Sequence, residues 1–136
     1  IITDSMIVLN TYKGPRPDHI DSLKGLKVGV NKSYSIYRHV KDKPVKAVSV
    51  SNDIRGLRML RTMRFNILLA VKENILFLNK SDLKLSLVFY DIHRRNFKLC
   101  ISKKWPNSKE LIKVFNKGLQ LIKKDGTYNK IQNKYH

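Results

Sequence analysis

The sequence predicts an α/β fold with a mainly parallel sheet flanked by helices. Three observations point to this class. Runs rich in β-formers alternate with helical patterns along the 136 residues, an order typical of parallel sheets. The run from Phe65 to Val71 is almost continuously apolar, as expected for a strand covered on both faces. Residues 107–124 repeat apolar side chains at the spacing of an amphipathic helix.

The order of strands follows from β-rich runs separated by turn residues. The expected strands are Met6–Tyr12, Leu26–Val30, Val45–Val50, Phe65–Val71, Lys84–Tyr90 and Phe97–Ser102. Gly14 and Pro15 end the first run, and a polar loop follows Val30. Cys100 lies inside the last strand, where we expect it to pack rather than to react.

Two shorter helical segments are expected before the C-terminal helix. Residues 36–40 are consistent with a helical turn, and 72–79 with a short helix. A longer helix should run over 53–63, with Asn52 among the polar residues suited to cap it. Its arginines at 55, 58 and 61 fall largely on the side opposite the apolar residues. This stripe could hold phosphate, but a solvated face is the favoured interpretation.

The last long helix should begin at Asn107 or Ser108, with Glu110 placed for a capping box. The residues of its apolar face are Leu111, Phe115, Gly118, Leu119 and Ile122. Gly126 suits the left-handed residue that ends a helix. Thr127 should then start a short helix through Tyr135, with Ile131 turned inward.

Charge and length restrict the function classes. Lys and Arg number 28 against 10 Asp and Glu, giving a net charge of +18. Such a charge suggests nucleic acid or an anionic membrane as a partner, but the basic residues are spread along the chain and no nucleic-acid-binding motif accompanies them. We favour a lysine-rich surface. The length suits one domain or one lobe, and the longest apolar runs are far short of the roughly 20 residues of a membrane span.

A search for catalytic motifs finds little. The histidines, at 19, 39, 93 and 136, have no metal-site spacing, and the single cysteine excludes an internal disulfide. There is no phosphate loop, dinucleotide fingerprint or nucleophile elbow. We therefore expect no catalytic residue, no metal and no cofactor, and a binding module rather than an enzyme.

Three ordered segments carry a resemblance. They are Ser22-Leu23-Lys24-Gly25-Leu26-Lys27-Val28-Gly29-Val30, the stretch 57–69, and the stretch from Phe97 through Lys124-Asp125-Gly126-Thr127-Tyr128-Asn129-Lys130-Ile131. Together they resemble the bacterial family 3 extracellular solute-binding proteins, the periplasmic amino-acid-binding type. The resemblance implies a type II periplasmic-binding-protein-like lobe. It also implies capture of a small polar solute, with amino acids as one candidate class, by closure of two lobes.

The resemblance implies ligand-binding roles for Ser33, Tyr34 and Ser35, in the loop after Val30. In the family, hydroxyl and backbone N–H groups of this loop hold a carboxylate. Tyr34 is bulkier than usual in the family, and the family's Gly-Arg-x-Asp-Ala reads Met63-Arg64-Phe65-Asn66-Ile67 here. Two further departures concern the ligand: Ser33 replaces the customary glycine, and Val71 stands where the family has an aspartate that binds the ligand's amino group. The second departure predicts a different ligand or a sensor or orphan role.

The resemblance covers the second half of the family's length. It predicts a hinge-side strand and linker over 1–25, the second lobe over 26–96, and a return strand with C-terminal helices over 97–136. The first lobe, with its ligand-gripping arginine, has no counterpart here. Because the chain begins with Ile1 rather than Met, we expect a fragment or a processed chain.

The partners expected from the resemblance are an ABC transporter permease or a membrane receptor, in the periplasm or outside the cell. The first lobe or a second chain should cover the apolar face of the last long helix, and nucleic acid is not expected. Two alternatives stay open: a ligand-sensing domain of a membrane signalling protein, and a basic nucleic-acid-binding module.

Overall fold

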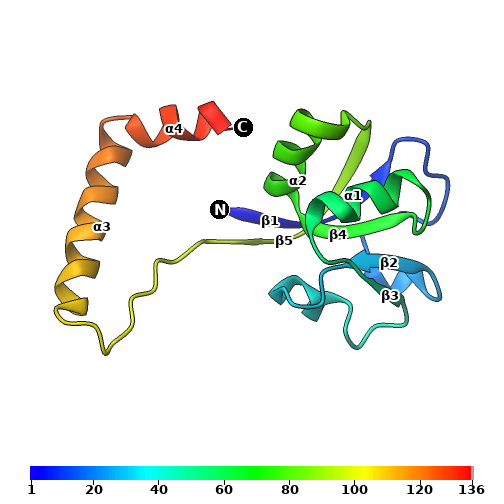
Figure 1. Cartoon of the computed structure of the whole chain (residues 1–136), viewed down its shortest axis with the longest axis horizontal. Coiled ribbons are helices and arrows are strands. Elements are labelled where there is room, and N and C mark those ends of the chain that lie inside the picture. The colour runs from blue at the N-terminus through cyan, green and yellow to red at the C-terminus, as the bar shows by residue number, and fades with distance from the viewer. Residues whose placement is uncertain (136) are drawn as a thin grey trace. The chain divides into compact units, whose positions relative to one another are not determined.

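The computed structural model describes residues 1–135, which divide into two compact units (Figure 1). The first unit is Ile1–Asn96, and the second starts at Phe97. His136, one of the histidines considered as a metal ligand, lies outside the described residues.

Within the described chain, the first unit is built on a five-stranded sheet with the order β3-β2-β4-β1-β5. Its strands are β1 (Ile2–Leu9), β2 (Lys27–Val30), β3 (Lys46–Ser49), β4 (Ile67–Val71) and β5 (Leu87–Arg95). β2 pairs in parallel with β3 and with β4, whereas β1 pairs antiparallel with β4 and with β5. Only β1 therefore runs against the direction of the other strands in the described sheet, and the predicted mainly parallel α/β sheet is confirmed.

Both faces of the sheet are covered, as the apolar run 65–71 predicted. Successive side chains of a strand point to opposite faces. Ile67 and Leu69 accordingly pack in one core cluster, with the 3-10 helices η1 (Ile20–Leu23) and η2 (Ser35–His39). Leu68 and Ala70 pack in the other, with helices α1 (Asp53–Arg61) and α2 (Lys72–Leu78). All four side chains are buried, so β4 forms the centre of the core.

Helix α1 forms where its N-terminal residues predicted. The Asn52 side chain accepts a hydrogen bond of 2.9 Å from the backbone N–H of Arg55, which satisfies one of the donors left free at a helix start. Arg55, Arg58 and Arg61 are exposed. The arginine stripe is thus the solvated face of an amphipathic helix.

The last predicted strands need correction. β5 starts at Leu87, after a single π-helical turn over Asn79–Leu83, and continues to Arg95 through residues too polar to read as a strand. The predicted strand Phe97–Ser102 is wrong, because no described residue pairs with it. A strand needs a ladder partner, and the described part of the second unit contains only helices and loop. The expectation that Cys100 packs inside that strand is wrong too, since it is exposed.

The second unit consists of α3 (Ser108–Lys124) and α4 (Thr127–Tyr135), separated by Asp125 and Gly126. Gly126 adopts φ +82°, the left-handed conformation predicted for it. The predicted side-chain cap of α3 is wrong. Asn107 itself has φ 56°, unlike the extended backbone of a typical N-cap, and its side chain makes no capping hydrogen bond.

The apolar face of α3 is exposed within its unit. On this face Leu111 and Phe115 are 43% and 45% exposed, Leu119 and Ile122 are half-buried, and residues 97–134 include no buried side chain. Ile131, expected to turn inward, is 47% exposed because this unit has no core for it to enter. None of the helices within residues 1–135 has the length and hydrophobicity of a bilayer span.

Candidate functional site

The sheet brings the ends of several strands together at one edge, which we call the carboxyl edge. It comprises the ends of β2 and β4 at Val30 and Val71, the end of β5 at Arg95, and the start of β1. Asp4 pairs with Val71 on one side, and Ile2 pairs with Arg95 on the other. In open α/β sheets, ligands bind in the crevice outside the carboxyl ends of the strands. This edge is therefore the first place to look for a site.

The predicted loop Ser33-Tyr34-Ser35 follows β2 at this edge. Its start is fixed by Asn31, which is buried. The Asn31 Oδ1 accepts a hydrogen bond of 3.0 Å from the backbone N–H of Ser33, and its Nδ2 donates to the carbonyl oxygen of Ser51 at 3.2 Å. The Ser33 N–H is thus already used inside the loop. All three predicted residues are exposed.

Ser35 is hydrogen-bonded to Arg95 at the end of β5, a strand that is not a neighbour of β2 in the sheet. Arg95 Nη1 donates a hydrogen bond of 3.0 Å to the Ser35 hydroxyl oxygen, joining the start of η2 to the end of β5. The other two predicted residues make only local hydrogen bonds in the described chain: Ser33 with Asn31, and the Tyr34 backbone with Asn31 and Tyr37. The structure therefore links only Ser35 to a side chain from a distant element.

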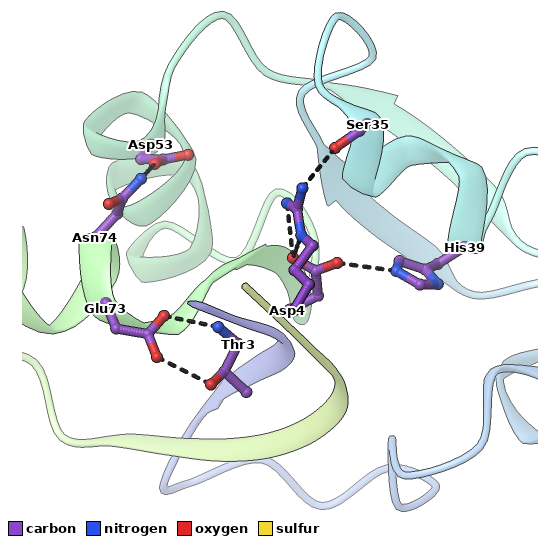
Figure 2. Close-up of polar contacts among 8 residues, drawn as sticks. Thr3, Asp4, Ser35, His39, Asp53, Glu73 and Asn74 are labelled. Atoms are coloured by element: carbon purple, nitrogen blue, oxygen red, sulfur yellow. Dashed lines mark hydrogen bonds and ion pairs between the residues drawn. The ribbon is translucent and has the colours of Figure 1, made fainter. Parts of the chain in front are cut away.

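Asp4 is the centre of this arrangement, and the sequence analysis missed it. Its side chain is 0% exposed. The Oδ1 atom accepts hydrogen bonds from Arg95 Nη2 at 3.0 Å and Nε at 3.3 Å, while Oδ2 lies 3.0 Å from Nε2 of His39 (Figure 2). A buried charge is tolerated only when it is paired. Its signal in the sequence is weak, because Asp4 stands between the polar residues Thr3 and Ser5, ahead of the apolar run that begins at Met6.

Two further acids lie near the edge, each held by a neighbour (Figure 2). Glu73, in the first turn of α2, accepts hydrogen bonds of 2.9 Å from the backbone N–H and from the hydroxyl of Thr3. Asp53, in the first turn of α1, accepts one of 3.3 Å from Asn74. Partial burial raises the pKa of Asp53, and the hydrogen bond from Asn74 offsets only part of that rise.

The pKa of Asp91, on β5, is shifted in the opposite direction to that of Asp53. Partial burial acts to raise its pKa, but hydrogen bonds from Ser5 and Lys72, with the positive charges of Lys72 and Arg94, outweigh burial and lower it. The Ser5 hydroxyl donates at 2.8 Å and the Lys72 ammonium at 3.1 Å. Asp91 therefore stays ionised and joins β5 to β1, through Ser5, and to the first residue of α2, Lys72.

A cavity of about 500 Å³ lies at the opposite edge, beside the first residues of β2 and β4. Its lining comprises Thr11, Tyr12, Lys13, Gly14, Pro15, Leu26, Lys27, Met63, Arg64, Phe65, Asn66 and Ile67. Ser33, Tyr34 and Ser35 do not line it. The described residues also contain no group of three or more His, Cys, Asp or Glu side chains placed to hold a metal ion.

No family model and no curated sequence matches the chain, whereas solved structures do. An ancestral arginine-binding protein bound to arginine aligns with a TM-score of 0.78 and 24% identity, over 98% of this chain and 60% of that one. The amino acid ABC transporter substrate-binding protein AbpA of Streptococcus pneumoniae, bound to L-arginine, aligns at 0.74 and 18%, over 98% and 56%.

A third similar structure is AncCDT-1, an ancestral amino acid-binding protein and a precursor of cyclohexadienyl dehydratase. It aligns with a TM-score of 0.78 and 19% identity, over 98% of this chain and 57% of that one. The chain thus spans somewhat under two thirds of the length of the structures it matches. The resemblance stated from the sequence motifs is confirmed at the level of fold. The chain has the fold of the amino acid-binding proteins of ABC transporters, as a periplasmic-binding-protein-like α/β lobe.

Proposed function

We propose that the chain is the larger part of a solute-binding protein that captures a small polar solute and delivers it to a membrane protein. Amino acids are the first class to test, because the similar structures are named as amino acid-binding proteins. The observation that carries the proposal is the hydroxyl of Ser35 at the carboxyl edge of the sheet, held in place by Arg95. The loop Ser33-Tyr34-Ser35 would contact the solute directly.

The proposal assigns a role to each part of the chain. Residues 1–25 would form the hinge-side strand and linker, 26–96 the second ligand-binding lobe, and 97–136 the return segment and C-terminal helices. The exposed apolar face of α3 would pack against a first lobe or a second chain. Apolar surface of this kind is usually covered by a partner. Capture would proceed by closure of the lobes around the solute.

The partners follow from the same proposal. A permease of an ABC transporter would receive the solute, or a membrane receptor would sense the loaded protein. The site would then face the periplasm or the cell exterior. Binding needs no catalytic group, so the expectation of a protein without enzymatic activity is part of this proposal.

The binding test uses the ¹⁵N-labelled 136-residue chain, titrated with pools of amino acids and other small polar solutes in an NMR experiment. A single lobe makes only part of the contacts, so we expect a Kd on the order of 1 mM, equivalent to about −4 kcal/mol. The amide signals of Ser33, Tyr34 and Ser35 should shift and saturate. Binding of no solute, or shifts confined to the opposite edge, would exclude the proposed function.

A variant pair tests the role of the hydroxyl. Ser35→Ala should weaken solute binding by about 1 kcal/mol, or roughly fivefold in Kd, because one hydrogen bond is lost. Ser86→Ala is the matched control, since Ser86 is exposed and precedes β5 at the opposite edge. Equal affinities in the two variants would exclude Ser35 from the site.

A further inference from the structure

We infer that the cavity at the edge of the sheet opposite the carboxyl edge is a second binding site, which takes a small organic anion made of an apolar body and one negatively charged group. This inference goes beyond the proposed function and does not depend on it. β4 runs from Ile67, which lines the cavity, to Val71 at the carboxyl edge. A strand rises about 3.3 Å per residue, so the two edges lie on the order of 13 Å apart along β4.

The first step is the construction of the cavity. Three segments that are distant in the sequence form it: residues 11–15 after β1, residues 26–27 around the start of β2, and residues 63–67 between α1 and the first residue of β4. All three belong to the first unit, so the cavity is formed within one compact body. Its volume of about 500 Å³ lies within the range of small-molecule pockets, about 300–1,000 Å³.

The second step is the apolar floor. Phe65 and Ile67 line the cavity and are buried, and Leu26 is half-buried. The Phe65 ring has no space to retreat, because it packs so closely on Gly29 that a Cβ atom there would lie 2.2 Å from its Cζ. The floor is therefore formed before any ligand binds. A preformed apolar pocket favours an apolar group, since little has to be ordered on binding.

The loop after β1 forms another wall. The Tyr12 hydroxyl donates a hydrogen bond of 3.0 Å to the carbonyl oxygen of Pro15, which closes the loop on itself. The Tyr12 ring lies against Gly14, where a Cβ atom would be 2.5 Å from its Cζ. These two contacts fix the ring, so Tyr12 adds an aromatic residue of set orientation to the lining.

Met63 adds an exposed apolar side chain to the lining. It is 61% exposed and has φ 58°, in the left-handed region that favours glycine. The turn uses only backbone groups here, since the Met63 N–H donates to the carbonyl oxygen of Leu60 at 3.1 Å. Glycine would form this turn with less strain, so the turn does not account for the methionine. A flexible thioether side chain is suited to contact with an apolar ligand.

The charges around the cavity decide the class of ligand. Lys13, Lys27 and Arg64 line it, one from each of the three segments, and no acidic residue is part of the lining. All three residues are exposed, and none of them forms an ion pair within residues 1–135. Three cations around one apolar cavity attract a negative group and repel a positive one. The matching ligand is therefore an anion with an apolar body.

The test titrates the ¹⁵N-labelled chain with naphthaleneacetate, with its neutral amide and with acetate, and follows the amide signals. We expect naphthaleneacetate to shift the signals of residues 26–27 and 63–67 and to saturate them. The amide lacks the charge and acetate lacks the apolar body, so each should bind at least about fivefold more weakly. Equal affinities for naphthaleneacetate and its amide, or no saturable shift of these signals, would overturn the inference.

Salt provides a second measure of the charge. Raising the NaCl concentration from about 0.02 to about 0.5 M should weaken binding of naphthaleneacetate and leave binding of the amide unchanged, because salt screens exposed charges. Equal effects of salt on the two compounds would show that the cations take no part, and would overturn the choice of an anion.

A pair of double variants separates the cations of the cavity from the general positive charge of the chain. Lys27→Gln with Arg64→Gln should weaken binding of naphthaleneacetate at least about fivefold and change that of the amide by less than about twofold. The control is Lys32→Gln with Arg55→Gln, which removes the same charge from exposed residues after β2 and in the first turn of α1. It should change either Kd by less than about twofold. Equal losses in the two double variants would overturn the site.

Met63→Gly tests the apolar part without straining the fold. Glycine tolerates the left-handed conformation, so the urea midpoint should not fall. Binding of naphthaleneacetate should weaken at least about threefold, because an apolar contact is lost, whereas the weak binding of acetate should not change. A variant of undiminished stability with an unchanged Kd for naphthaleneacetate would overturn the site as described.

The two proposals fail in different ways. Saturable shifts at residues 26–27 and 63–67 with naphthaleneacetate would support this inference even if no solute from the pools shifted the Ser33–Ser35 signals. Naphthaleneacetate shifts confined to the Ser33–Ser35 loop, or to the exposed apolar face of α3, would overturn this inference and leave the test of the proposed function unaffected.

Discussion

Replacement of Gly29 by alanine should destabilise the first unit through a direct clash. Gly29 lies in β2, opposite Leu68 of β4 and Val48 of β3. A Cβ atom at this position would lie 2.2 Å from Cζ of Phe65 and 2.5 Å from each of its two Cε atoms. The ring of Phe65 is 2% exposed, so it has no open space into which to move.

The size of the effect follows from two opposing contributions. Ordinary carbon contacts lie near 3.5–4.0 Å, so the ring or the strands must shift by more than about 1 Å. Overpacking of a core costs about 1–3 kcal/mol. Alanine restricts the unfolded chain and returns about 0.4–1 kcal/mol. We therefore expect Gly29→Ala to lower the free energy of unfolding by about 1–2 kcal/mol.

The assay is urea unfolding followed by far-UV circular dichroism, with a double-mutant cycle. Phe65→Leu alone should cost about 1 kcal/mol or more through lost buried volume. In the double variant the added methyl fills part of that volume. The double variant should therefore lose less unfolding free energy than the sum of the two single variants, by at least about 1 kcal/mol. A Gly29→Ala chain as stable as wild type, or strictly additive effects, would refute the packing of Phe65 on Gly29.

Three further predictions concern single residues. The pKa of Asp91 in the folded chain lies below its ordinary value of 3.8. The ionised Asp91 therefore stabilises the folded chain above that pH, and this stabilisation is lost as pH falls through the folded pKa. In urea titrations at several pH values, Asp91→Asn should lose less stability below about pH 4 than wild type does. Asn52→Ala removes the N-cap of α1 and should cost about 1 kcal/mol of unfolding free energy in the same assay, and an unchanged midpoint would contradict the cap. Gly118→Ala in α3, where an added Cβ meets nothing within 4 Å, should raise helix content by circular dichroism, because alanine in a helix is favoured over glycine by about 1 kcal/mol.

Much of the fold could be predicted because its signals are local. The apolar run 65–71 predicted a strand buried on both faces, and β4 is that strand. The cap and periodicity of α1, and the periodicity of α3, predicted the positions of these helices within a few residues. The end of β5 could not be predicted in this way. Its last residues pair with β1 although their polar character is that of a loop.

The residues of the candidate site could likewise be predicted only in part. The loop Ser33–Ser35 was found from its position after β2 in a recognisable motif, and whether it binds a solute stays a prediction. Asp4 and Arg95 were not found, because their partnership joins residues 91 positions apart in the sequence. An acid between Thr3 and Ser5 and an arginine in a polar run indicate no site until the two strands lie side by side.

The sequence by itself determined the class of fold, the order of most elements and the exposed apolar face of α3, because hydrophobic periodicity and turn residues act over a few positions. Only the tertiary structure decided that β1 lies between β4 and β5 and runs against them. That placement buries Asp4 and brings Arg95 to Ser35, because a charge carried into a sheet must find its partner on a neighbouring strand or loop.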